Sequence, residues 1–125
     1  MLHFFPKIAI LLFPLFIKET IQLQGDCTVY FAVEGNSKAE CWGESDHFEC
    51  NYASCHNGNF QWTPMTGCQL QDSPDQSFSD QQCVEYHFDT ISARYFCKVH
   101  RHKTYVCPLK NNISKMQCGN CVKTR

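Results

Sequence analysis

The sequence has one long apolar run and no second one. Ile8–Ile17 spans ten residues, which is too short to cross a hydrocarbon core of roughly 30 Å as a helix. Lys7 precedes it, and a basic segment followed by a short apolar run is typical of a secretory signal peptide. We therefore expect residues 1–25 to be a signal peptide cleaved after Gly25, and the mature chain to be secreted without a membrane span.

The sequence also lacks the motifs of several common catalytic sites. It contains neither a glycine-rich phosphate loop nor a G-x-S-x-G elbow. A sustained apolar stripe at helical spacing is missing too, which argues against long helices. Short segments rich in aromatic and β-branched residues predict strands instead. These segments are 28–33, 47–53, 84–89, 93–100 and 103–109, with a turn at 57–59 before a further strand candidate at 60–62.

Cysteine is abundant: all ten cysteines lie in residues 26–125. This density in a short secreted chain indicates a disulfide scaffold, and the even count allows five bridges with no thiol left over. The sequence therefore predicts a small β-rich disulfide-stabilised fold. The cysteines assigned to bridges are Cys27, Cys41, Cys50, Cys55, Cys68, Cys83, Cys97, Cys107, Cys118 and Cys121.

The cysteine spacing suggests an internal repeat. Cys27 and Cys41 are 14 residues apart, as are Cys83 and Cys97. In each half a tyrosine follows the first cysteine by three residues, and an aromatic residue precedes the third cysteine by two. A period of 56 or 57 residues indicates two tandem, diverged copies with five cysteines each.

The repeat predicts a division of the mature chain. The proposed parts are a first copy at 26–70, a polar linker or loop at 71–82, and a second copy at 83–125. Because each copy holds an odd number of cysteines, at least one disulfide must join them into one compact unit.

The two copies differ in charge. Residues 26–82 carry nine acidic residues and one basic residue, whereas residues 83–125 carry two acidic and eight basic residues. The halves attract each other within one body, or the basic half docks an acidic partner such as a nucleic acid, an anionic glycan or an acidic protein. The candidate partner-binding residues are Arg94, Lys98, His100, Arg101, His102 and Lys103.

Zinc is the alternative to disulfides, in zinc-finger-like cysteine and histidine modules. A C-x2-C step suits one zinc ion, and two histidines in an H-x-H step on a strand would point to the same face. The alternative zinc ligands are Cys97, His100, His102, Cys118 and Cys121. An oxidising secretory route favours disulfides, so the expected fold holds no metal and no other cofactor.

Three further expectations concern individual residues. Glu85, His87, Arg94 and His100 offer an acid–base set for an alternative function as a small secreted hydrolase or ribonuclease. Asn112 begins the only N-x-[ST] sequon and is the expected glycosylation site. The aromatic residues Tyr52, Phe60, Trp62 and Trp42 could build the core or form a surface for a partner, and the core is the default expectation.

Three aromatic-x-cysteine steps occur along the chain, at residues 48–50, 95–97 and 105–107. In a small cysteine-rich chain behind a signal peptide, they resemble the secreted effector candidates of rust fungi. The resemblance covers the whole chain at the level of a class and carries no catalytic residues with it. It implies secretion during infection, in some cases entry into host cells, and binding of a host macromolecule. The expected protein is therefore a non-enzymatic virulence effector, or alternatively a zinc-binding one.

Overall fold

A computed structural model describes residues 22–73, 75, 77–100, 103–112 and 115–124. The signal-peptide prediction falls almost entirely on residues outside this part of the chain. The described residues form a 3-10 helix at Tyr52–Ser54 and eleven strands. The strands are β1 (Leu23–Asp26), β2 (Tyr30–Glu34), β3 (Lys38–Trp42), β4 (His47–Asn51), β5 (Cys55–His56), β6 (Thr63–Leu70), β7 (Ser79–Cys83), β8 (Glu85–Asp89), β9 (Arg94–Lys98), β10 (Thr104–Pro108) and β11 (Gln117–Lys123).

The predicted β-rich disulfide-stabilised fold is confirmed. Each of the five principal predicted segments contains a strand, namely β2, β4, β8, β9 and β10. The candidate at 60–62 is not a strand, because Phe60 only bridges back to Asn57 across the predicted turn. The linker at 71–82 is shorter than predicted, because β7 begins at Ser79. No helix among the described residues is long and apolar enough to span a bilayer.

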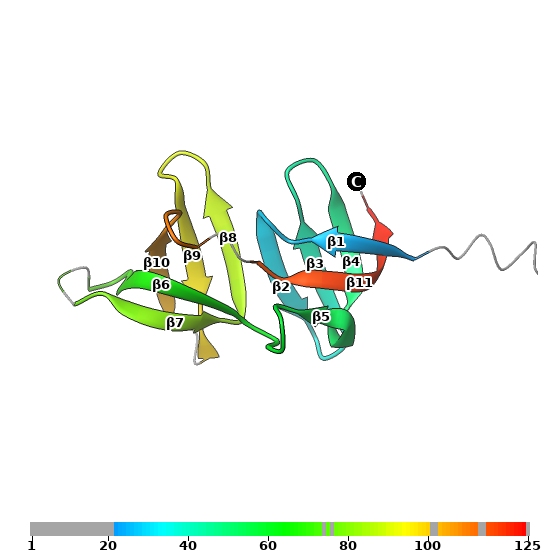
Figure 1. The fold of residues 1–125 in the computed structure, drawn as a ribbon, viewed down its shortest axis with the longest axis horizontal. Coiled ribbons are helices and arrows are strands. Elements are labelled where there is room, and N and C mark those ends of the chain that lie inside the picture. The colour runs from blue at the N-terminus through cyan, green and yellow to red at the C-terminus, as the bar shows by residue number, and fades with distance from the viewer. Residues whose placement is uncertain (1–21, 74, 76, 101–102, 113–114, 125) are drawn as a thin grey trace, which may run out of the picture.

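The strands form one antiparallel sheet with the order β1-β11-β4-β3-β2-β8-β9-β10-β6-β7, and β5 pairs with β11. Figure 1 shows that this sheet folds into two lobes side by side. We call the group of β1 to β5 with β11 the first lobe and the group of β6 to β10 the second lobe. The pairing of β2 with β8 joins them.

Each half of the chain contributes its last strand to the opposite lobe. Strand β6 precedes the loop that starts at residue 71, yet it pairs with β7 and β10 of the second lobe. Strand β11, the last of the chain, pairs with β1 and β4 of the first lobe. Figure 1 shows the chain passing from one lobe to the other just before each of these strands. The two halves are therefore interlocked rather than arranged as separate beads.

The two exchanged strands have similar local geometry. Cys68 of β6 is bonded to β10, and Cys121 of β11 is bonded to β4. The residue before each cysteine, Gly67 or Asn120, has a positive φ, and each strand has a register shift against its outer neighbour. These parallels agree with a duplicated unit, although the duplication itself stays a prediction.

The sequence repeat aligns Tyr30 with Tyr86, but the strand pairing aligns Phe31, one residue further on, with Tyr86. The register places Tyr86 opposite Cys97, and the residue opposite Cys41 is Phe31. The segment from Cys27 to Phe31 is one residue longer than the segment from Cys83 to Tyr86. The β8–β9 turn is one residue longer than the β2–β3 turn, so both cysteine spacings are 14. Equal spacing therefore conceals a shift in the strands between the cysteines.

The strand exchange also redistributes charge. Residues 63–112, which build the second lobe, carry five acidic and five basic residues. Residues 26–62 and 115–125 together carry six acidic and four basic residues. Lys123 of β11 illustrates the effect, because its Nζ lies 3.1 Å from Asp46 Oδ1 in the first lobe. Each lobe therefore has nearly equal numbers of acidic and basic residues, and the charge difference between the two halves of the sequence largely disappears in the fold.

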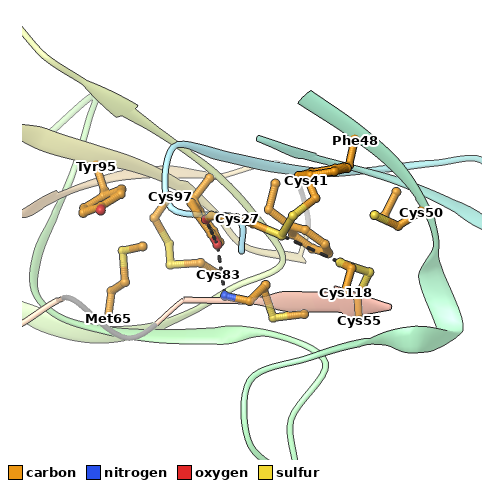
Figure 2. Packing of buried hydrophobic residues seen from close by; sticks show 14 of the residues in the cluster. Cys27, Cys41, Phe48, Cys50, Cys55, Met65, Cys83, Tyr95, Cys97 and Cys118 are labelled. Atoms are coloured by element: carbon orange, nitrogen blue, oxygen red, sulfur yellow. Dashed lines mark hydrogen bonds between the residues drawn. A yellow bond between two sulfur atoms is a disulfide. The ribbon is translucent and has the colours of Figure 1, made fainter. Parts of the chain in front are cut away.

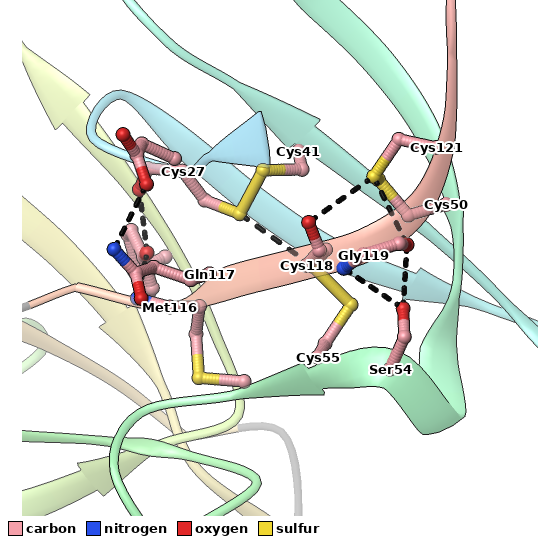
Figure 3. Close-up of a disulfide and its surroundings, with 12 residues drawn as sticks. Cys27, Cys41, Cys50, Ser54, Cys55, Met116, Gln117, Cys118, Gly119 and Cys121 are labelled. Carbon is pink, nitrogen blue, oxygen red and sulfur yellow. Dashed lines mark hydrogen bonds between the residues drawn. A yellow bond between two sulfur atoms is a disulfide. The ribbon is translucent and has the colours of Figure 1, made fainter. Parts of the chain in front are cut away.

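All ten cysteines are paired, as predicted. The bridges are Cys27–Cys41, Cys50–Cys121, Cys55–Cys118, Cys68–Cys107 and Cys83–Cys97. Three of them connect the half before residue 71 with the half after residue 82, which satisfies the requirement set by the odd counts. Figure 3 shows two of these, Cys50–Cys121 and Cys55–Cys118, fastening β11 to the first lobe.

The core consists largely of these disulfides (Figure 2). All ten cysteines are buried there, together with Phe31, Ala39, Phe48, Met65, Tyr86, Tyr95 and Met116. Tyr86 links the lobes, because its hydroxyl donates to the Cys27 carbonyl (2.5 Å) and accepts from the Met116 N–H (3.1 Å). Of the four aromatic residues expected by default in the core, Tyr52 is partly buried and packs against the core cluster. Trp42, Trp62 and Phe60 lie outside the cluster and are partly or fully exposed.

Strand β1 conflicts with the predicted cleavage site. Gly25 is buried in this strand and pairs with Cys118 of β11. Cleavage after Gly25 would remove three of the four residues of β1 and uncover the aromatic ring of Phe48. A cleavage site upstream of Leu23 would keep the strand intact, so the structure argues for a correction in that direction.

Replacing Gly25 with alanine is expected to lower the free energy of unfolding by about 1–3 kcal/mol, as overpacking of a core does. An added Cβ would lie 2.9 Å from Phe48 Cδ2 and 3.1 Å from Cys41 Sγ, and the disulfide cannot move aside. Denaturant unfolding measures the change. Gly119→Ala is the control, because its Cβ would make only an ordinary 3.7 Å contact; equal losses would contradict the close packing.

Candidate binding face

A row of aromatic side chains crosses the solvent-facing side of the sheet. Each member lies directly opposite the next on the neighbouring strand: His47 opposite Trp42, Trp42 opposite Tyr30, Tyr30 opposite His87, and His87 opposite Phe96. We call these five residues the aromatic row. The row covers β4, β3, β2, β8 and β9, so it runs across both lobes.

Strand alternation explains why this row faces outward. The neighbours Phe31, Cys41, Phe48 and Tyr86 are buried on the other side of the same strands, and successive side chains of a strand point to opposite faces. All five members of the row keep partial or full solvent exposure. The sheet is therefore apolar on both faces along this line, which is unusual for a sheet with one solvated face.

Neighbouring rings of the row contact each other within each lobe, as two stacked pairs and one tilted pair. The centroids of Trp42 and His47 are 4.0 Å apart with 3° between planes, and those of Tyr30 and Trp42 are 4.5 Å apart. His87 and Phe96 are 4.9 Å apart with 21° between planes. Because both faces of the Trp42 indole are covered, it presents its edge to solvent. Stacking of a base or a sugar on that ring is therefore not favoured.

Charged residues flank the row. Glu85 and Lys98 lie opposite each other on β8 and β9, with Lys98 Nζ 3.3 Å from Glu85 Oε2. In the first lobe, Lys38 Nζ lies 3.6 Å from Glu49 Oε1. Glu40 lies directly opposite Glu49, so two carboxyl groups are neighbours beside the row.

Two shallow grooves adjoin the row in the second lobe. One, of about 290 Å³, is lined by Glu85, His87, Phe96 and Lys98 among others. The other, of about 410 Å³, lies where the lobes meet and shares Glu85 and Lys98 with the first. The Glu85–Lys98 ion pair thus borders both grooves.

The structure separates the predicted partner-binding residues. Arg94 and Lys98 are at opposite ends of β9, and the charge of Lys98 is engaged by Glu85. His100 lines the groove between the lobes, and Lys103 is exposed just before β10. Arg101 and His102 lie outside the described residues. The hairpin predicted between Cys97 and Cys107 is present as β9 and β10.

Three of the five alternative zinc ligands are held in disulfides, and His102 lies outside the described residues. Cys97, Cys118 and Cys121 are bonded to other cysteines, and His100 follows β9 rather than lying on a strand. Within the described residues, the three potential ligand atoms that lie close together are sulfurs of Cys27, Cys41 and Cys118. These sulfurs belong to two adjacent disulfides, with Cys27 Sγ and Cys118 Sγ 3.7 Å apart, and are not thiolates.

The acid–base set for a hydrolase is divided between two grooves. Glu85 lines both of them, sharing one with His87 and the other with His100. Arg94 is at the far end of β9, opposite Asp89. The arrangement gives this alternative no specific support.

Asn112 is in a position that conflicts with the predicted glycosylation. Its side chain is 3% exposed, and it bonds the backbone of β6 in both directions. The Thr66 N–H donates to Oδ1 (2.8 Å), and Nδ2 donates to the carbonyls of Thr66 (3.0 Å) and Pro108 (2.7 Å). A glycan on Nδ2 has no room in this fold, so the assignment of Asn112 changes from a modified residue to a structural one.

Sequence reasoning missed the aromatic row and the role of Asn112, because both depend on pairing between distant segments. A weak signal existed: Tyr30, Trp42 and His47 alternate with core residues. No protein-family model, curated protein or solved structure matches the chain.

Proposed function

We propose that the protein is a small secreted, non-enzymatic binding protein of the effector type, which engages a macromolecule of its host through the outward face of the sheet. The aromatic row is the observation that carries this proposal. Contiguous exposed aromatic surface is uncommon on soluble proteins and marks interaction sites. Tyrosine, tryptophan and phenylalanine are also the residues enriched at the centres of protein interfaces.

The scaffold supports the same proposal. Five disulfides fit a small secreted cysteine-rich protein. Three of them cross between the halves of the chain, and β2 pairs with β8 in the middle of the row. A face held rigid in this way loses little conformational entropy on binding. Action inside a host cell, after translocation, belongs to the same proposal.

The basic loop after β9 is a second proposed contact, for an acidic part of the partner. His100 and Lys103 are exposed there, next to the groove between the lobes. Since Lys98 is engaged by Glu85, this contact is smaller than the sequence suggests.

Capture of host proteins by the immobilised protein tests the proposal. The variant Trp42→Ser/Phe96→Ser removes two rings of the row and is expected to weaken capture of the main partner roughly 30-fold, as loss of a central hot spot does. The matched control is Phe60→Ser/Trp62→Ser, because these rings form a stacked pair outside the row, with centroids 4.9 Å apart and partial or full exposure. Circular dichroism and thiol counting confirm that both variants fold. Equal capture by the two variants would refute the proposal.

A further inference from the structure

The first lobe places more carboxyl groups than lysines beside the aromatic row: Glu34, Glu40 and Glu49 against Lys38. Glu40 of β3 lies directly opposite Glu49 of β4, whereas Lys38 contacts Glu49 and lies opposite Glu34. Like charges on directly opposite residues destabilise a sheet. Burial, followed by Glu34 and Glu49, raises the pKa of Glu40. A further cation would therefore be favourable at this surface.

The negative charge extends along the row into the second lobe. Tyr30, at the middle of the row, has a raised pKa because of burial, followed by Glu85, Glu40 and Glu34. The lysines beside these acids, Lys38 and Lys98, already contact Glu49 and Glu85. The face therefore combines apolar ring edges with an excess of carboxyl groups.

We propose that the aromatic row and the carboxyl groups of Glu34 and Glu40 form a docking surface for an arginine- or lysine-rich segment of a partner protein. This inference rests on the proposed function and specifies its ligand. A guanidinium or ammonium group would make charge-assisted hydrogen bonds to these two carboxyl groups. The aliphatic stem of the same side chain would cover the ring edges.

The dimensions of the row suit an extended segment. Neighbouring strands are about 4.8 Å apart, so the five-strand row is roughly 19 Å long, which corresponds to about six residues of extended chain. The covered face of Trp42 disfavours ligands that bind by ring stacking. A basic peptide needs only the ring edges and the carboxyl groups.

Fluorescence titration with a defined peptide tests this inference. The chain has two tryptophans, so in the full-length Trp62→Phe protein the emission comes from Trp42 alone. A nona-arginine peptide is expected to change this emission saturably, and a nona-glutamate peptide is expected to leave it unchanged. Adding Glu34→Gln/Glu40→Gln is expected to weaken nona-arginine binding about tenfold. The matched control, Asp72→Asn/Asp75→Asn, removes the same charge at exposed positions of the β6–β7 loop and is expected to have little effect.

Two results would overturn the inference: no saturable response to nona-arginine, or equal weakening by the two pairs of substitutions, which would indicate general charge attraction. The failure of this inference is distinguishable from failure of the proposed function. If host capture still depends on Trp42 and Phe96 while nona-arginine does not bind, only the ligand class is wrong. If nona-arginine binds as expected but capture ignores the row, the proposed function is wrong.

Discussion

Replacing Asn112 with alanine is expected to lower the free energy of unfolding by on the order of 3 kcal/mol, because the buried Asn112 amide makes three hydrogen bonds to the backbone that alanine cannot make. The Asn112 side chain pairs with the backbone of Thr66 in β6 as a neighbouring strand would, accepting from its N–H and donating to its carbonyl. It reaches this position from the segment after β10, where Nδ2 also donates to the Pro108 carbonyl. Thr66 itself is exposed, so the expected loss is that of the three hydrogen bonds. Denaturant unfolding monitored by fluorescence measures the loss.

Asn112→Asp provides a sharper comparison. The aspartate side chain can still accept from the Thr66 N–H, but it cannot donate to the two carbonyl groups and would carry a buried charge. We expect it to be at least as destabilising as Asn112→Ala at neutral pH. A loss below about 1 kcal/mol for both variants would show that the amide is not the link between β6 and the segment after β10.

The same contacts predict that Asn112 carries no glycan. Protein secreted from eukaryotic cells is expected to have the mass of the unmodified polypeptide with five disulfides. Ser114→Ala removes the sequon without changing Asn112, so its mass is expected to differ from the wild type only by the substitution. An additional loss of sugar mass in Ser114→Ala would contradict the buried position of Asn112.

Removing the Cys68–Cys107 bridge by substituting both residues with alanine is expected to cost about 3–4 kcal/mol. This bridge has a sequence separation of 39 and ties the exchanged strand β6 to β10. The nearest other bridge in the second lobe, Cys83–Cys97, lies within that interval and does not hold β6. Loss of Cys68–Cys107 therefore frees a long loop in the unfolded chain, which is the main source of disulfide stabilisation in the chain-entropy model.

Cys50→Ala/Cys121→Ala is the control for this prediction. Its sequence separation of 71 is the largest of the five, so a simple loop-length argument predicts the larger effect here. However, Cys55–Cys118 has a separation of 63 and joins neighbouring positions of the same segments. The second bridge keeps most of the loop closed, so we expect a smaller loss than for Cys68–Cys107. The reverse order in denaturant midpoints would contradict the assumption that the paired bridges substitute for each other.

The local features of the fold were predictable from sequence, and the reason is physical. Segments such as 84–89 and 103–109 contain the aromatic and β-branched residues that favour strands, and they form β8 and β10. Ten cysteines in a short chain predict five disulfides, and all ten are paired. These inferences depend on residue type and local order, which the sequence states directly.

Pairing between distant segments was not predictable in the same way. Strand β7 (Ser79–Cys83) contains mostly polar residues and resembles a loop, because its order comes from pairing with β6. Trp42 was assigned to the core because tryptophan is usually buried, but its strand position places it on the outward face. The aromatic row requires the registers of β2, β3, β4, β8 and β9 to be known together, and no single segment contains that information.

Because of the strand exchange, the two lobes become able to fold at different times during synthesis. The second lobe is contiguous in sequence, from β6 to β10, so all its strands and both its disulfide pairs are available once residue 108 has left the ribosome. The first lobe cannot be completed until β11, which follows β10 in the sequence, emerges. Until then Cys50 and Cys55 have no native partners, because Cys118 and Cys121 are made after the other eight cysteines. The thiols of the first lobe therefore stay without their native partners for longer than those of the second lobe. During this interval they can mispair, and mispaired thiols need rearrangement by disulfide exchange.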